Sequence, residues 1–292
     1  MRQIRKAVVP AAGFGTRLLP VTKTVPKEML PVAGKPVIQY IVESIVASGI
    51  EDVVLITGAN KKAVEDYFDT AFELECTLEK SGKRELLDQV RAVTTMADIA
   101  YVRQHQPLGN GHALLSARDV VGDEPFLVLW GDDILLGDPP VPRQLVDVAE
   151  RCDGPVVGVR RVPPEDYEKY GMFEVERIDG EERVARALSV IEKPPRDESP
   201  SDLAQIGGFV LTPDIFDLLE NTQAGPSGEI FLADALVQLM QQRPVYTYEF
   251  TGRRYDAGNK LDYLKANIEL TLEDPKLGPQ LRAYMHGLHD EG

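Results

Sequence analysis

The chain has 292 residues and a formal net charge of −15 at pH 7, with 43% hydrophobic and 27% charged residues. This composition is typical of a folded globular protein and excludes a disordered chain, a fibrous repeat and a disulfide-stapled miniprotein. A surface with this charge repels nucleic acids and anionic lipids at long range, so we expect neither as a partner. The only cysteines, Cys76 and Cys152, form no paired motif, which favours a reduced compartment, and we expect the cytoplasm.

The elements expected from the hydrophobic pattern alternate between strands and helices over the first 70 residues. An apolar run at residues 6–10 indicates a buried strand, and a stretch punctuated by prolines follows over residues 13–36. A helix over 36–49, a strand over 53–57 and a helix over 60–68 come next. This order predicts a parallel sheet with right-handed crossovers.

A highly charged segment then interrupts the alternation. Residues 71–92 have a helical pattern and predict an inserted helical arm. The alternation then resumes along the chain. The expected strands are 99–103, 126–130 and 156–159, and the expected helices are 111–117 and 142–151.

The last part of the chain is richer in strands. We expect strands over 172–176, 187–191, 206–211 and 245–250, helices over 213–220 and 229–241, and a final helix from about residue 259 followed by an acidic tail. The sequence has no internal repeat and no low-complexity linker. We therefore expect one continuous sheet rather than two separate domains.

A Gly-rich loop, GFGTR at residues 13–17, follows the first strand. Glycines allow backbone N–H groups to approach a phosphate closely. The dinucleotide fingerprint fails because Leu18 stands where its third glycine should be, and no Gly-Lys-Ser/Thr completes a P-loop. Arg17 and Lys27 supply two cations behind the loop, which favours a triphosphate. The alternative is a tight turn with a solvated Arg17.

Carboxylates and a lysine follow later strands. Asp132 comes directly after an apolar strand, and Asp256 offers a second carboxylate at another strand end. Ligands of open α/β sheets bind beyond such strand ends, and Mg²⁺ prefers oxygen ligands. Glu192 can accept hydrogen bonds from sugar hydroxyls, and Lys193 can neutralise a phosphate. The alternatives are a turn or helix cap for Asp132 and a solvated ion pair for Glu192 and Lys193.

Several segments together carry a resemblance to a known family. AGFGTRLLP at residues 12–20 and PKEMLP at 26–31 resemble the signature of the sugar-1-phosphate nucleotidylyltransferases. The segment 68–88, with VRQ at 102–104, GNGHA at 109–113 and DAGNK at 256–260, resembles the bacterial UTP–glucose-1-phosphate uridylyltransferases within that family. The similarity covers roughly residues 4–275.

The resemblance implies an α/β fold with a Rossmann-like, mixed and mostly parallel central sheet flanked by helices, of the nucleotidyltransferase or glycosyltransferase-A type. It implies a single domain over residues 1–275, with a nucleotide-binding half at about 1–135, a sugar-binding half at about 136–275 and a tail at 276–292. The expected reaction joins UTP and glucose 1-phosphate to give UDP-glucose and pyrophosphate, with Mg²⁺ as cofactor. A homodimer or homotetramer is also expected from the resemblance.

The resemblance also assigns residues to roles. Catalysis is assigned to Arg17, Lys27, Asp132 and Lys193. Nucleotide binding is assigned to Ala11, Ala12, Gly13, Gly15, Thr16, Glu28, Gln104, Gly109 and Gly111. Sugar binding is assigned to Gly171, Glu192, Lys193 and Gly207, and Mg²⁺ binding to Asp132 and Asp256.

Two departures from the family pattern and three rival functions stay open. Asn110 stands where the family commonly has Leu, and Gly131 where many members have Pro. A pocket discriminates a methyl group by only about 1–3 kcal/mol, so a thymidylyltransferase or a pyrimidine-promiscuous enzyme is one alternative. A non-catalytic nucleotide-sugar sensor is another, although it is expected to lose a metal-binding Asp or Lys193. A glycosyltransferase is a weaker alternative, because Asp132 and Asp133 are adjacent rather than in a D-x-D motif.

Overall fold

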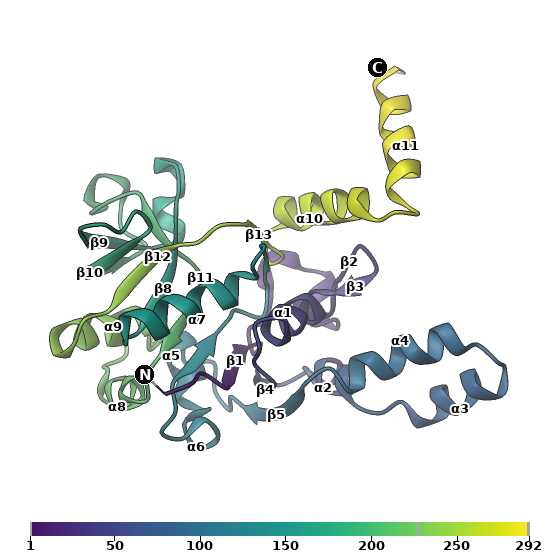
Figure 1. The fold of residues 1–292 in the computed structure, drawn as a ribbon, viewed down its shortest axis with the longest axis horizontal. Coiled ribbons are helices and arrows are strands. Elements are labelled where there is room, and N and C mark those ends of the chain that lie inside the picture. The colour runs from purple at the N-terminus through teal and green to yellow at the C-terminus, as the bar shows by residue number, and fades with distance from the viewer. Residues whose placement is uncertain (1, 226–227, 291–292) are drawn as a thin grey trace.

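The computed structural model describes residues 2–225 and 228–290, and its centre is a nine-stranded sheet (Figure 1). The strands of this sheet, in chain order, are β1 (Lys6–Pro10), β4 (Asp52–Thr57), β5 (Asp98–Arg103), β6 (Phe126–Val128), β8 (Val156–Arg161), β9 (Gly171–Arg177), β10 (Val184–Glu192), β11 (Leu203–Leu211) and β12 (Tyr246–Glu249). Their spatial order is β5-β4-β1-β6-β11-β8-β12-β10-β9.

Parallel pairing is concentrated at one end of the sheet. Strands β5, β4, β1 and β6 pair in parallel, and so do β8 and β12. The other pairings, β11 with β6 and β8, and β10 with β9 and β12, are antiparallel. The prediction of a mixed α/β sheet is confirmed, but "mostly parallel" is wrong for the second half. The short connection between β9 and β10 leaves no room for a crossover, so these strands can pair only in an antiparallel way.

The antiparallel half also closes on itself. Ala204 of β11 pairs with Met172 of β9, so β11, β8, β12, β10 and β9 form a small barrel. Strand β11 pairs with β6 as well, and it therefore belongs both to the barrel and to the parallel half. One sheet thus connects the two parts of the chain without a break.

Helices cover both faces of the sheet. Helices α1 (Val37–Val46) and α7 (Val141–Cys152) contribute to the hydrophobic core on one face, and α5 (Asn110–Leu115), α8 (Asp214–Asn221) and α9 (Leu232–Gln242) to the core on the other. The uninterrupted apolar run of β4 fits burial between these two layers. Helices α2 (Lys62–Phe68) and α6 (Arg118–Val121) complete the body.

Two helical segments project from the body (Figure 1). The predicted arm is present as a hairpin of α3 (Phe72–Lys80) and α4 (Arg84–Thr94), which extends two residues beyond the expected end. In the second segment, α10 (Lys260–Glu273) leads to α11 (Gly278–Asp290), which turns away from it and lies within the segment expected only as an acidic tail. Among the described residues, no helix has the length and apolar content needed to cross a membrane.

Two small ribbons were not predicted. Strands β2 (Pro31–Val32) and β3 (Lys35–Pro36) form one of them, so the following helix begins at Val37. Strands β7 (Asp133–Leu136) and β13 (Arg253–Asp256) form the other, with Asp256 opposite Asp133. The second ribbon brings together two carboxylate-bearing segments that are far apart in the sequence.

Candidate active site

The loop after β1 is ordered by short 3-10 turns rather than by a helix. These turns cover Thr16–Leu18, Val21–Lys23 and Lys27–Met29, and prolines separate them. Gly15 has a φ of 67°, and a Cβ there would lie 3.2 Å from Cβ of Lys27, so only glycine fits without strain. The hydroxyl of Thr22 donates to the Gly15 carbonyl at 2.8 Å. The loop therefore folds back and brings Arg17 and Lys27 to the same side.

Both cations of this loop meet the predicted metal-binding carboxylates. Lys27 Nζ donates to Asp132 Oδ2 at 2.6 Å, and Arg17 Nη1 donates to Asp256 Oδ2 at 3.0 Å. Arg17 Nη2 also lies 3.8 Å from Asp132 Oδ2. A Cβ at Gly258 would lie 2.6 Å from Arg17 Nη2 and 2.8 Å from Asp132 Oδ2, so the absence of a side chain there permits the approach. The structure thus brings four of the predicted residues together.

The pairing of Lys27 with Asp132 fixes the charge of both groups. Burial by itself would lower the pKa of Lys27, but the carboxylates of Asp132 and Glu28 outweigh burial and raise that pKa. Burial would likewise raise the pKa of Asp132, but Lys27 and Arg17 outweigh it and hold that pKa below its usual value. At neutral pH the site therefore contains a fixed cation beside a fixed anion.

A second buried ion pair lies behind the first. Glu28 is 0% exposed and accepts a hydrogen bond from Lys61 Nζ at 2.6 Å. Burial raises the pKa of Glu28, and the same burial lowers the pKa of Lys61. The second oxygen of Glu28, Oε1, is the one fully buried side-chain polar atom without a hydrogen-bond partner among the described residues. A buried acceptor of this kind is costly unless a ligand supplies a donor.

The residues predicted to read the base also lie close to one another. The side-chain amide of Gln104 donates to the Gly109 carbonyl at 3.1 Å and lies 3.1 Å from Nδ1 of His112. The Gly111 N–H donates to the Ile230 carbonyl at 2.9 Å. At the start of the sheet, the Ala11 N–H donates to the Ile56 carbonyl at 2.8 Å, which continues the ladder between β1 and β4. Gln104 and Gly109 are therefore direct neighbours.

Asn110, which departs from the family pattern, has a structural partner. Its side-chain Oδ1 accepts a hydrogen bond from the Leu232 N–H at 2.9 Å, at the start of α9. Leu232 N–H is one of the helix donors that have no partner within the helix. Asn110 therefore ties the loop before α5 to α9, which a leucine cannot do.

The predicted sugar-binding residues lie at the open end of the β9–β10 hairpin. Glu192 pairs with Gly171 in the strand register, and the Lys193 N–H donates to the Tyr170 carbonyl at 3.0 Å. The Lys193 side chain is 55% exposed, and its Nζ lies 3.4 Å from Glu192 Oε1. Unlike Lys27, Lys193 has no tight carboxylate partner in the described part of the chain.

Residues of the phosphate-side cluster and residues of the sugar-side hairpin line one cleft of about 790 Å³. The predicted residues that line it are Arg17, Asp132, Gly171, Glu192, Lys193 and Asp256. Gly207 is not among the lining residues; a Cβ there would lie 2.4 Å from the Phe250 ring, whereas Gln205 of the same strand does line the cleft. The cleft therefore joins Arg17 and the two carboxylates to the sugar-side hairpin, whereas Lys27, Gly207 and the residues predicted to bind the nucleotide are not among its lining residues.

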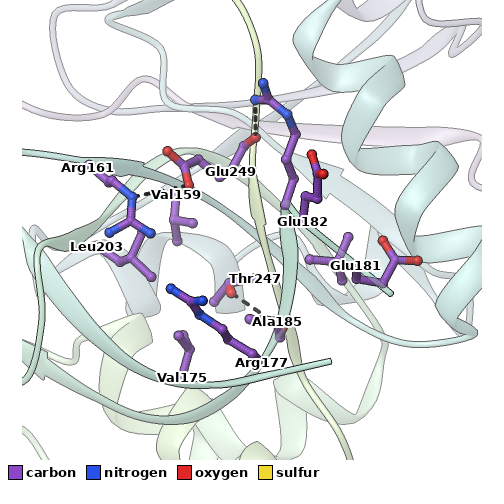
Figure 2. A pocket seen from close by; sticks show the side chains of 12 residues that line it. Val159, Arg161, Val175, Arg177, Glu181, Glu182, Ala185, Leu203, Thr247 and Glu249 are labelled. Atoms are coloured by element: carbon purple, nitrogen blue, oxygen red, sulfur yellow. Dashed lines mark hydrogen bonds and ion pairs between the residues drawn. The ribbon is translucent and has the colours of Figure 1, made fainter. Parts of the chain in front are cut away.

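A second cavity, of about 320 Å³, opens at the other end of the barrel (Figure 2). Arginines and glutamates around this cavity form ion pairs with nearby side chains. Arg161 Nε lies 3.5 Å from Glu249 Oε2, and Glu181 Oε1 lies 2.6 Å from Arg151 Nη1. This cavity shares no lining residue with the cleft and contains none of the predicted site residues. It is therefore not the candidate active site.

Sequence reasoning missed several residues of the cleft. Asp133, Tyr170, Gln205 and Arg254 all line it, and Lys61 partners Glu28 behind it. Arg254 lies two positions before the predicted carboxylate Asp256, but only the β7–β13 pairing shows that it meets Asp133. No sequence signal identified that pairing.

The family model for nucleotidyl transferases matches residues 6–273 of the chain. The chain belongs to the nucleotidyl transferase family. The resemblance found in the sequence is therefore confirmed, and so is the fold that it implied, apart from the share of parallel strands.

Relatives within the nucleotidyl transferase family match over nearly the whole chain. A UTP–glucose-1-phosphate uridylyltransferase of Bacillus subtilis (strain 168) is 46% identical over 288 residues, which is 99% of this chain and 98% of the relative. A UTP-bound UGPase from Acinetobacter baumannii is 38% identical with a TM-score of 0.90, covering 97% of this chain and 99% of the other. A UDP-glucose pyrophosphorylase complexed with UDP-glucose is 38% identical with a TM-score of 0.85, covering 93% and 100%.

Proposed function

We propose that the chain transfers the uridylyl group of UTP to glucose 1-phosphate and releases pyrophosphate. The observation that carries the proposal is the joining of two groups in one cleft, the Arg17–Lys27–Asp132–Asp256 cluster and the Gly171–Glu192–Lys193 hairpin end. Relatives whose names specify this reaction, or these ligands, match over nearly the full chain and support it.

On the nucleotide side, the Gly-rich loop and its cations act on the triphosphate. Backbone N–H groups of Gly13, Gly15 and Thr16 approach phosphate oxygens, while Arg17 and Lys27 neutralise their charge. For Lys27 this requires a partner exchange, because its ammonium group donates a hydrogen bond to Asp132.

The base is assigned to the surface formed by Ala11, Ala12, Gln104, Gly109 and Gly111. Gln104 uses its amide N–H group on Gly109, so its side-chain oxygen is left to accept from the N3–H of uracil. Glu28 is also assigned to the nucleotide, but it is 0% exposed and is not among the residues that line the cleft.

Mg²⁺ is assigned to Asp132 and Asp256. Both carboxylates contact the same Arg17 guanidinium, at 3.8 Å and 3.0 Å, so they face one centre, and their hard oxygens suit this ion. Among the described residues, no group of three or more His, Cys, Asp or Glu could hold a metal, so water and phosphate oxygens would complete its shell. When bound, Mg²⁺ neutralises phosphate charge and stabilises the leaving pyrophosphate.

On the sugar side, Glu192 accepts hydrogen bonds from glucose hydroxyls and Lys193 binds the phosphate of glucose 1-phosphate. Gly171 and Gly207 are assigned to the glucose ring, and of the two only Gly171 lines the cleft. The exposed Lys193 is available to an incoming anion, since no tight ion pair must first be broken.

The reaction needs two anions to approach each other. A phosphate oxygen of glucose 1-phosphate attacks the α-phosphorus of UTP in line, and pyrophosphate leaves. Charge neutralisation and positioning therefore dominate the catalysis. No covalent intermediate is required, and the sequence contains no G-x-S-x-G motif for a serine nucleophile.

The direct test is pyrophosphate release by the purified protein with Mg²⁺ and glucose 1-phosphate, with UTP, dTTP, ATP, CTP and GTP compared. Release with UTP alone is the expected result. Equal release with dTTP would replace the proposal with a broad pyrimidine enzyme. No release from folded protein with any nucleotide would remove the enzyme assignment and favour a sensor.

We further propose that the chain forms a homodimer or homotetramer. Leu261, Leu264 and Ile268 of α10 are 60%, 56% and 41% exposed, and their spacing places them on one face of the helix. Such a row of exposed apolar side chains is typical of an interface. Light scattering after size exclusion, with Leu264→Glu compared to Leu188→Glu on the barrel, tests this; a monomeric wild-type protein would refute it.

A further inference from the structure

An arginine that has no assigned role lies between the two sides of the cleft. Arg254 is on β13, two residues before the metal-assigned Asp256, and it lines the cleft. Its side chain is 12% exposed, and that of Asp133, its partner on β7, is 6% exposed. A guanidinium this deeply buried is stable only if its donors are used.

The contacts to Asp133 tie the β7–β13 ribbon together. Arg254 Nε and Nη2 both donate to Asp133 Oδ1, at 3.1 Å and 2.7 Å. Asp133 follows Asp132 in the chain and lies opposite Asp256 in the ribbon register. The pair therefore fixes the segment that carries both carboxylates assigned to Mg²⁺.

The remaining nitrogen of the same guanidinium, Nη1, reaches the sugar side. Arg254 Nη1 donates to the Tyr170 hydroxyl at 3.0 Å, and the guanidinium carbon lies 5.5 Å from the centre of the Tyr170 ring. Tyr170 directly precedes β9, and its carbonyl accepts from the Lys193 N–H at 3.0 Å. One side chain thus contacts both the carboxylate ribbon and the residue that holds Lys193.

We infer that Arg254 is a positioning residue. It holds the phosphate-side carboxylates and the sugar-side hairpin in place relative to each other, through Asp133 and Tyr170. This inference rests on the proposed function of the cleft. Arg254 uses one N–H of each of its three guanidinium nitrogens on Asp133 and Tyr170, and these contacts orient both partners. A misplacement of about 1 Å between reacting groups can cost about 100-fold in rate, which is why such a link matters.

The chain offers a matched control in the adjacent residue. Arg253 is next to Arg254, but its guanidinium contacts Glu273 of α10 at 2.5 Å and the hydroxyl of Tyr255 at 3.3 Å, outside the cleft. Arg253→Met removes the same charge and the same side-chain type from the same strand. It leaves both Asp133 and Tyr170 untouched.

The test compares ligands that span one side or both sides of the cleft. UTP engages only the nucleotide side, whereas UDP-glucose reaches both sides. For Arg254→Met and for Tyr170→Phe we expect UDP-glucose to bind about 10-fold more weakly by calorimetry, with the Kd of UTP within about threefold of wild type. Turnover of Arg254→Met should fall about 100-fold, and Arg253→Met should change neither Kd nor turnover.

Two further variants separate positioning from a merely structural role. Arg254→Lys keeps the charge beside Asp133 but cannot also reach Tyr170, so it should keep UTP binding and stability near wild type without restoring UDP-glucose affinity. If Arg254→Met does not fold, Tyr170→Phe and Arg254→Lys still decide the question. Equal weakening of UTP and UDP-glucose, or no change in either, would overturn the inference. A wild-type protein that binds both ligands but releases no pyrophosphate would instead overturn the proposed function, while the binding results would still decide the role of Arg254.

Discussion

The two sides of the cleft are prepared for substrate in different ways. On the phosphate side, Lys27 and Asp132 are bonded at 2.6 Å and each side chain is 16% exposed. On the sugar side, Lys193 is 55% exposed and its closest carboxylate oxygen is 3.4 Å away. The phosphate side is therefore built from charges that pair with one another, whereas the sugar side is open and leaves its cation available to an anion. Pre-organised charges are the usual source of large catalytic effects, so the two sides should respond differently to mutation.

The largest effect is expected on the built side, from Lys27→Met. The change removes the phosphate cation and leaves Asp132 buried without its closest partner. We expect kcat to fall by about 10³-fold or more, measured as pyrophosphate release. Lys23→Met is the control, since Lys23 is an exposed lysine of the same loop. A Lys27→Met enzyme with near-normal kcat would show that the paired charges of the phosphate side are not needed for catalysis.

On the open side, Lys193→Met should act mainly through glucose 1-phosphate. We expect kcat/KM for this substrate to fall by about 100-fold, because one charge-assisted contact to phosphate is lost. The KM for UTP should change far less. Arg196→Met removes an exposed cation three residues further along and should have little effect. An equal rise in both KM values would show that the two sides are not separate.

The contribution of the built side to folding stability should also depend on pH. Burial, together with the nearby Asp132 and Asp256, raises the pKa of Asp133 to about 6, although Arg254 opposes this shift. A carboxyl group with a raised pKa in the folded state stabilises the fold at acid pH and loses that contribution as pH rises through about 6.

The stability of wild type relative to Asp133→Asn should therefore decrease between about pH 4 and pH 7, by on the order of 2 kcal/mol. Urea unfolding across this range measures the difference. A difference that is flat or increases with pH would contradict the prediction.

The smallest effect is expected at Asn110. Asn110→Leu introduces the residue common in the family and removes the acceptor for the Leu232 N–H. One such hydrogen bond contributes about 1 kcal/mol, so the ratio of kcat/KM for UTP over dTTP should shift by about fivefold. Paired assays with the two nucleotides measure the ratio. An unchanged ratio would mean that the loop position does not depend on this contact.

The sequence predicted best those elements whose signal is local. The apolar runs of β1 and β4 and the charged arm of α3 and α4 needed no knowledge of distant partners. The β7–β13 ribbon was missed because Arg253 and Arg254 give β13 a polar sequence, and its partner lies more than a hundred residues away. Pairing between distant strands depends on the whole fold rather than on local propensity.

The residues of the candidate site also divide into those that the sequence predicted and those that it did not. Gly15, Arg17, Lys27, Asp132 and Asp256 were predicted from loops and strand ends, and the structure brings them together. The residues that hold them in place were not predicted, because Lys61 and Arg254 resemble ordinary surface cations in a sequence. The roles assigned to the individual site residues stay predictions that the variants above test.

Strand β11 limits how the protein can move when both substrates are bound. It pairs with β6 on one side and with β8 and β9 in the barrel, so the two parts of the chain share a hydrogen-bonded strand instead of a flexible connection. A hinge needs a few backbone residues that can absorb a change of dihedral angles. In β11 these can only be Gly207 and Gly208, which have φ values of 100° and 96° and lie where the register with β8 shifts, between the part paired with β9 and the part paired with β6. Movement between the two parts is therefore confined to this one point of β11, and the loops and hairpin ends that border the cleft are the other segments that can close around the substrates.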